Sequence, residues 1–210
     1  MQYHYAKTRF VLILLLVGGL VYAFSAHKVV PPKQLDNICV VLRLRPAWYL
    51  AAQKVEEKWG VSVSTQMAFI YRESHFRSEA MPKRKKLFRF IPWFRTSSAK
   101  GYAQAINNTW RVYLHETHQR GALRNNFARS LDFVGWYLHR AHHRLGVSKD
   151  DVYALYLAYH EGLSGYVRGY YQQQPQLMRI ARKVQRRALR YQQQLIQCKN
   201  QLPKKAWWHF

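Results

Sequence analysis

The chain is poor in acidic residues, with 10 Asp and Glu against 34 Lys and Arg among 210 residues. The resulting formal net charge of +24 favours polyanionic partners. Nucleic acid, anionic lipid head groups and an acidic wall polymer all fit this description. Charge alone does not choose among them.

Other features are scarce as well. Alternating runs typical of strands and internal repeats are absent, which argues against sheet and repeat architectures. A length of 210 residues accommodates one compact domain with a terminal extension and excludes two full-sized domains. The apolar fraction of 49% is high enough for a real core and argues against wholesale disorder.

The N-terminus carries an apolar segment. Lys7 and Arg9 precede residues 10–26, which are 17 uncharged and mostly apolar residues. This length is at the lower limit for spanning a bilayer, about 17–25 residues. The segment also fits a secretory signal with a cleavage site ending at Ala23, but that site lies inside the apolar run and so favours a retained anchor. Both interpretations predict export from about His27 onward, which puts nucleic acid out of reach. We therefore expect a location in the periplasm or cell envelope, anchored in the bacterial inner membrane, or secretion after cleavage.

Cys39 and Cys198 are the two cysteines of the chain, and both follow the apolar segment. An even pair in an exported chain predicts one disulfide, with two unpaired thiols as the alternative. The pair cannot form a zinc site alone. His115 with His118, and His139 with His143, have helical spacing, but no HExxH motif occurs, so we expect no metal and no cofactor.

Helical spacing dominates the rest of the chain. Predicted helices cover residues 48–59, 67–74, 127–138, 152–159 and 177–195, with Gly60 and Gly162 as stop signals and Ser62 or Ser64 and the sequence "SKDD" at 148–151 as start signals. Residues 82–98 contain two prolines and predict a long loop. The fold class is therefore all-α. We expect a signal or anchor over residues 1–30, a compact helical domain over 31–171, and a basic C-terminal helix and tail over 172–210.

Two carboxylates stand out among the ten acids. Most acids, including Glu116 and Asp132, follow patterns of exposed or helix-start residues. Glu73 and Glu161 instead end apolar helices, where the negative end of the helix dipole raises the pKa of a carboxyl group. A general acid needs such a raised pKa. The alternative for Glu73 is a plain ion pair with Arg72 or Arg77.

Three separated motifs resemble the soluble lytic transglycosylase (SLT) family, which is similar to goose-type lysozyme and belongs to glycoside hydrolase family 23. They are "ESHFRSEA" at 73–80, "GYAQA" at 101–105 and "AYHEG" at 158–162, and the resemblance covers about residues 45–170. The second motif departs from the family at Tyr102 and Ala103, and the third departs at His160 and Glu161. The resemblance implies a lysozyme-like helical domain.

The resemblance also implies a chemistry. Glu73 would be the single catalytic acid, cleaving the bond between N-acetylmuramic acid and N-acetylglucosamine in peptidoglycan glycan strands and leaving a 1,6-anhydro end. Ser74 would bind near the acetamido or lactyl group, Gln104 would line the cleft, and the Tyr159 hydroxyl would orient Glu73. Gly101, His160 and Glu161 would complete the substrate-binding set. Arg72 is expected to point away from Glu73.

Two other functions remain open. Glu161 could face Glu73 and hold a water, which would make the protein a hydrolase, or it could point outward and pair with Arg168. The altered second and third motifs also allow a wall-binding module without turnover. A basic nucleic-acid binder explains the charge but neither the apolar segment nor the three motifs.

Overall fold

The computed structural model of the protein describes residues 32–82, 84–87, 91–95 and 97–203. The predicted apolar segment at 10–26 lies outside these residues. No helix within the described ranges is both long and apolar enough to cross a membrane.

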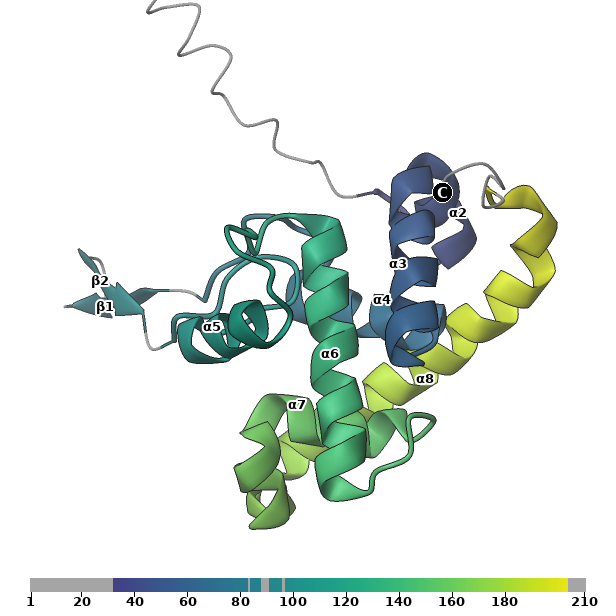
Figure 1. Cartoon of the computed structure of the whole chain (residues 1–210). Coiled ribbons are helices and arrows are strands. Elements are labelled where there is room, and N and C mark those ends of the chain that lie inside the picture. The colour runs from purple at the N-terminus through teal and green to yellow at the C-terminus, as the bar shows by residue number, and fades with distance from the viewer. Residues whose placement is uncertain (1–31, 83, 88–90, 96, 204–210) are drawn as a thin grey trace, which may run out of the picture.

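Helices make up most of the structure, as predicted (Figure 1). In chain order the elements are α2 (Ile38–Leu44), α3 (Pro46–Trp59), α4 (Val63–Ser74), β1 (Arg84–Leu87), β2 (Ile91–Arg95), α5 (Asn107–Glu116), α6 (Phe127–Leu145), α7 (Val152–Val167), η1 (Tyr170–Gln173), α8 (Pro175–Cys198) and η2 (Lys199–Gln201).

The helix ends follow the local signals of the sequence. Gly60 ends α3 in the left-handed conformation with φ of 66°, which glycine adopts without steric strain. The Ser62 side chain accepts from the Thr65 N–H at the start of α4, and the Asp151 side chain accepts from the Ala154 N–H at the start of α7. These caps confirm the predicted boundaries.

The all-α prediction is wrong in one segment. Strands β1 and β2 form an antiparallel hairpin inside residues 82–98, which were predicted to be a loop. Leu87 pairs with Ile91 and Lys86 with Pro92, with a register irregularity between Arg84 and Lys86. Proline lacks an N–H donor and is tolerated in a two-stranded hairpin because each strand has a free edge. Because proline is also a loop signal, the two prolines of this segment led to the prediction of a loop.

Helix α4 lies at the centre of the domain. All residues from Val63 to Ile70 are buried, and α3, α6 and α8 pack against the helix. Helix α8 contacts both α4 and α7 through an inner face that includes buried Leu177, Val184 and Tyr191. Through this packing the C-terminal helix braces the domain.

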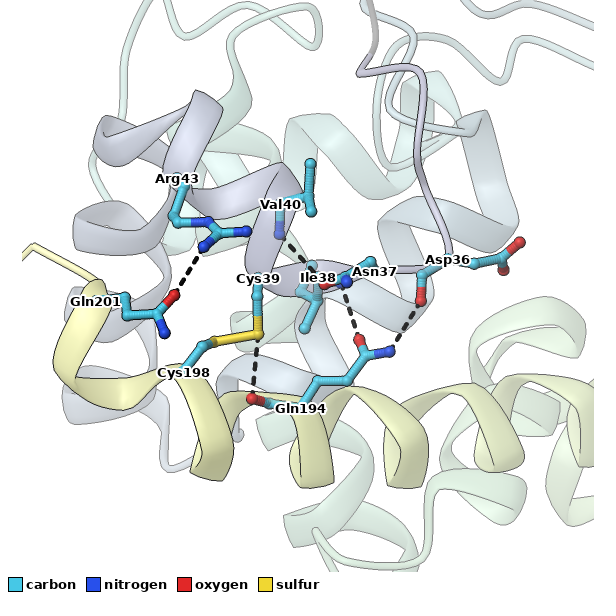
Figure 2. The surroundings of a disulfide bond; sticks show 9 residues. All are labelled: Asp36, Asn37, Ile38, Cys39, Val40, Arg43, Gln194, Cys198 and Gln201. Carbon is cyan, nitrogen blue, oxygen red and sulfur yellow. Dashed lines mark hydrogen bonds between the residues drawn. A yellow bond between two sulfur atoms is a disulfide. The ribbon is translucent and has the colours of Figure 1, made fainter.

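The disulfide joins the two ends of the described chain. Cys39 in α2 is bonded to Cys198, the last residue of α8, across a sequence separation of 159 residues (Figure 2). Gln194 strengthens the same junction, because its side chain accepts from the Ile38 N–H at 2.9 Å and donates to the Asp36 carbonyl at 3.2 Å. The predicted pairing is confirmed.

Removing this disulfide should lower stability substantially. A cross-link over so long a loop restricts the unfolded chain, and its loss typically reduces the free energy of unfolding by about 2–5 kcal/mol. We expect a decrease of this size for Cys39→Ser/Cys198→Ser, measured by urea unfolding followed by circular dichroism. Reductant should lower the stability of the wild type towards that of the variant and leave the variant unchanged. Equal stability of the oxidised and reduced wild type would contradict the assignment.

Candidate active site

Glu73 occupies the last turn of buried helix α4, where the chain turns sharply. His75 and Phe76 follow with φ of 52° and 59°, a left-handed conformation that is unfavourable for such side chains. Complete burial of Phe76, whose ring lies 5.6 Å from that of Trp48, offsets this strain. The turn therefore holds the end of α4, and Glu73 with it, in one orientation.

The second motif forms a tight turn around Gly101. Its φ is 76°, and a Cβ atom there would lie 2.0 Å from the Arg124 carbonyl oxygen, so no other residue fits without movement. The turn brings Gln104 back against the first motif. Its Nε2 donates to the carbonyl oxygens of Ala80 and Gly101, each at 2.8 Å. These bonds fix the amide group of Gln104.

The third motif lies where α7 is interrupted. Gly162 has φ of 75° and ψ of 158°, a conformation essentially restricted to glycine. The helix therefore breaks after His160 and Glu161 and restarts immediately. Gly162 was predicted to stop the helix, and the structure shows a kink with one further turn.

The three motifs meet at one cavity of about 360 Å³. Glu73 comes from the first motif, Gln104 and Ala105 from the second, and Tyr159, His160, Glu161 and Gly162 from the third. The remaining wall consists of Ser97, Ala99, Ile106, Thr109, Phe133 and Tyr137. Residues up to 89 positions apart in the sequence thus line one partly aromatic pocket that contains the Glu73 carboxylate.

Burial controls the protonation of Glu73. Desolvation raises the pKa of its carboxyl group, and this effect outweighs three opposing ones: the hydrogen bond from Tyr156 and the charges of Arg72 and His160. The described ion pairs do not include one between Glu73 and either Arg72 or Arg77. Glu73 is therefore an acid whose proton is retained to higher pH, and the plain ion-pair interpretation is not what the structure shows.

Tyr156, not Tyr159, is the hydrogen-bond partner of Glu73. The Tyr156 hydroxyl donates to the Glu73 Oε1 atom at 2.9 Å, whereas the Tyr159 hydroxyl donates to the Ala103 carbonyl at 2.6 Å. The predicted orienting role of Tyr159 is therefore wrong. The two tyrosines are three residues apart and share one face of α7, so helical spacing alone could not distinguish them.

Ser74 lies outside the cavity. Its side chain is fully buried, and its hydroxyl donates to the Ile70 carbonyl one turn earlier at 3.1 Å. This bond turns Ser74 into the core behind Glu73, so the structure does not bring it to the substrate position that the resemblance implies. Gly101 likewise shapes the turn without lining the cavity.

Glu161 faces inward. Its side chain is 11% exposed, lines the same cavity as Glu73 and lies 3.1 Å from the Nδ1 atom of His160. Arg168, the predicted partner of an outward-pointing Glu161, contacts Tyr170 instead. The outward orientation is therefore wrong, and two carboxylates share the pocket.

Asp132 was predicted to be a solvated charge but is buried away from this cavity. It accepts from Lys58 Nζ at 3.1 Å, Trp59 Nε1 at 2.8 Å and the Tyr113 hydroxyl at 2.8 Å. These donors come from two other helices, α3 and α5, whereas Asp132 itself lies in α6, and no local pattern reveals them. Asp132 is a structural carboxylate. Across the described residues, no group of three or more His, Cys, Asp or Glu side chains has the arrangement of a metal site.

The two tyrosines provide a matched test of the geometry. The bond from Tyr156 lowers the pKa of Glu73, so Tyr156→Phe should raise that pKa further. Tyr159→Phe removes a hydroxyl bonded elsewhere and should leave the pKa of Glu73 nearly unchanged. Carboxyl-carbon NMR titration of selectively labelled glutamate measures both. A larger shift in Tyr159→Phe than in Tyr156→Phe would contradict the assignment.

Comparison with protein families agrees with this geometry. A family model described as "Transglycosylase SLT domain" matches residues 10–198, which include all three motifs, both cysteines and α8. No curated protein and no solved structure matches the chain significantly. The match covers most of the 210 residues, so the chain belongs to the family of transglycosylase SLT domains.

Proposed function

We propose that the protein is a peptidoglycan lytic transglycosylase in which Glu73 is the single catalytic acid and base. Membership of the SLT family supports transglycosylase activity in general and peptidoglycan as the substrate class. The observation that carries the specific proposal is the position of Glu73, which lines the shared cavity with a raised pKa and a bond from Tyr156.

The proposed reaction has two steps. Protonated Glu73 donates its proton to the oxygen between N-acetylmuramic acid and N-acetylglucosamine, and the bond to C1 of the muramic sugar breaks. The Glu73 carboxylate then takes the proton of the C6 hydroxyl while O6 bonds to C1. This closes the 1,6-anhydro ring, restores protonated Glu73 and consumes no water.

The surroundings of Glu73 suit a single-acid mechanism. Burial keeps the proton on Glu73 until a substrate oxygen is available. The bond from Tyr156 orients the carboxylate and favours its charged form after the first proton transfer. Gln104 and His160 offer polar groups to the sugar. The aromatic rings of Phe133 and Tyr137 form an apolar part of the cavity wall.

One observation favours a second candidate. Glu161 lines the same cavity and could hold a water for attack on C1, which would produce an ordinary reducing end. Its hydrogen bond to His160 would support such a base. The two reactions give different products, because the hydrolase product retains one additional water.

The cellular location is part of the proposal. Peptidoglycan lies outside the inner membrane, and residues 10–26 predict either an anchor in that membrane or a cleaved signal. Both interpretations would deliver the domain to its substrate.

Glu73→Gln should abolish turnover. A positioned general acid typically contributes about 10²–10⁴ to the rate, and glutamine keeps the acceptor for Tyr156 while losing the proton. We expect a loss of about 10³-fold in release of soluble muropeptides from purified sacculi, with anhydro-muropeptides as the wild-type products in mass spectrometry.

Glu161→Gln is the matched control, since it removes a carboxylate from the same cavity. Its activity should fall by less than about tenfold, with anhydro products retained, if Glu73 acts alone. Reducing-end products lost in Glu161→Gln would favour the hydrolase. If the wild type binds sacculi without releasing any product, this would contradict the catalytic proposal and favour a wall-binding module.

The pH dependence of stability provides a further test. In the unfolded chain Glu73 has its ordinary pKa, and in the folded chain burial raises it. Ionisation therefore destabilises the folded state. This penalty is absent below the ordinary pKa, grows as the pH rises towards the raised value and is complete above it.

Glu73→Gln should therefore melt at a higher temperature than the wild type at about pH 8, and at nearly the same temperature at about pH 4. Activity of the wild type should fall as the pH rises through the same raised pKa, because the acid loses its proton. Differential scanning fluorimetry across this range checks the first expectation. A destabilised Glu73→Gln protein at high pH would contradict the raised pKa.

A further inference from the structure

Helix α8 carries an unusual concentration of cations. Residues 175–198 contain six Lys and Arg residues and no Asp or Glu. Arg187 points inward, where it bonds to Asp36 at 2.7 Å and lies over the Tyr71 ring. The other five are exposed and form what we call the α8 basic face: Arg179, Arg182, Lys183, Arg186 and Arg190.

The basic face lies opposite the side that packs on the domain. At about 100° per residue, its five cations fall within an arc of about 100°. The buried side chains Leu177, Ala181, Val184 and Ala188 fall on the other side of the helix. The cations are therefore presented together, along three turns, to whatever lies outside the protein.

Little within the domain neutralises this face. None of its five cations takes part in an ion pair among the described residues. Asp36 is the nearby acid, since the charge of Arg190 helps to lower its pKa, but Asp36 is already bonded to Arg187. Like charges at helical spacing repel one another, so the arrangement destabilises the isolated helix and favours an external polyanion.

Exposed apolar side chains border the basic face. Leu189 is 53% exposed and Ile196 is 72% exposed, and both lie on one flank of the arc of cations. A helix that combines cations with apolar side chains on its outer surface fits a membrane interface, where cations meet phosphates and apolar groups enter the acyl boundary. A hydrophilic glycan offers no such place for Leu189 and Ile196.

The chain enters the described structure beside α8. The Tyr191 hydroxyl donates to the Leu35 carbonyl at 2.5 Å, and Gln194 bonds to Asp36, so residues 35–36 lie along the C-terminal half of the helix. Only residues 27–31 separate the apolar stretch at 10–26 from Pro32. Such a connection spans at most about 20 Å. An anchored chain would therefore hold this end of α8 close to the bilayer.

We propose that the α8 basic face binds the anionic head groups of a phospholipid bilayer, with Leu189 and Ile196 at the acyl boundary. The surface is distinct from the catalytic cavity, whose lining includes no residue of α8. The protein can therefore contact the membrane and a glycan strand at the same time.

The test uses the full chain with a fluorescent label on α8. Gln193 is exposed beside the basic face, and Gln193→Cys accepts an environment-sensitive nitrobenzoxadiazole label because both native cysteines are in the disulfide. The protein is combined with vesicles of phosphatidylcholine, with or without phosphatidylglycerol, that contain a head-group-proximal quenching lipid. We expect quenching in the anionic vesicles and little quenching in phosphatidylcholine alone, whether or not residues 10–26 insert.

Arg182→Gln/Arg186→Gln should weaken this contact. Each cation near an anionic surface contributes about fivefold to association, so two should reduce the ratio of docked to undocked protein about 25-fold. The matched control is Lys54→Gln/Arg120→Gln, which removes the same charge from exposed positions in α3 and in the turn between α5 and α6. It should leave quenching nearly unchanged. Circular dichroism confirms that each variant is folded.

Three results would overturn the proposal: no quenching in anionic vesicles, equal loss of quenching in both double variants, or quenching that the α8 double variant leaves intact. Co-sedimentation with purified sacculi distinguishes the other polyanion. If Arg182→Gln/Arg186→Gln impairs sacculus binding but not vesicle contact, the face binds the wall polymer. Loss of catalysis in Glu73→Gln should leave vesicle contact intact, so the two proposals fail separately.

Discussion

The burial of α4 is the constraint on which the rest of the structure depends. Every side chain from Val63 to Ile70 is buried, so the helix must be covered on all sides, and α3, α6 and α8 provide this cover. The disulfide then ties the far end of α8 to α2. Because α4 is held so completely, its last turn is rigid, and the carboxylate of Glu73 is positioned by packed helices instead of a loop.

Two carboxylates, buried Asp132 and half-buried Glu73, show how the surroundings decide the role of a residue type. Asp132 receives hydrogen bonds from Lys58, Trp59 and Tyr113, which compensate its negative charge within the core. Glu73 receives one, from Tyr156, and desolvation then dominates and raises its pKa. The first arrangement joins three helices together. The second leaves a carboxyl group whose proton can be used, at some expense of stability.

Helix α8 serves two surfaces at once. Its inner face completes the cover of α4 and so contributes indirectly to the rigidity of Glu73. Its outer face collects cations that the domain itself leaves without ion-pair partners among the described residues. The separation of the two faces follows from helical periodicity, which allows one segment to be both a structural brace and a charged surface.

The sequence by itself determined the features that depend on near neighbours along the chain. Helix caps at Gly60, Ser62 and Asp151 follow from local hydrogen bonding and conformational preference, and the three motifs singled out Glu73 and Gln104. The hairpin escaped prediction because Pro92 within it and Pro82 just before it also signal a loop. The tertiary structure alone decided three further points: Tyr156 instead of Tyr159 bonds to Glu73, Ser74 turns into the core, and Glu161 turns into the cavity. In each case the rotation of a helix about its own axis decides the outcome, and packing against distant segments sets that rotation.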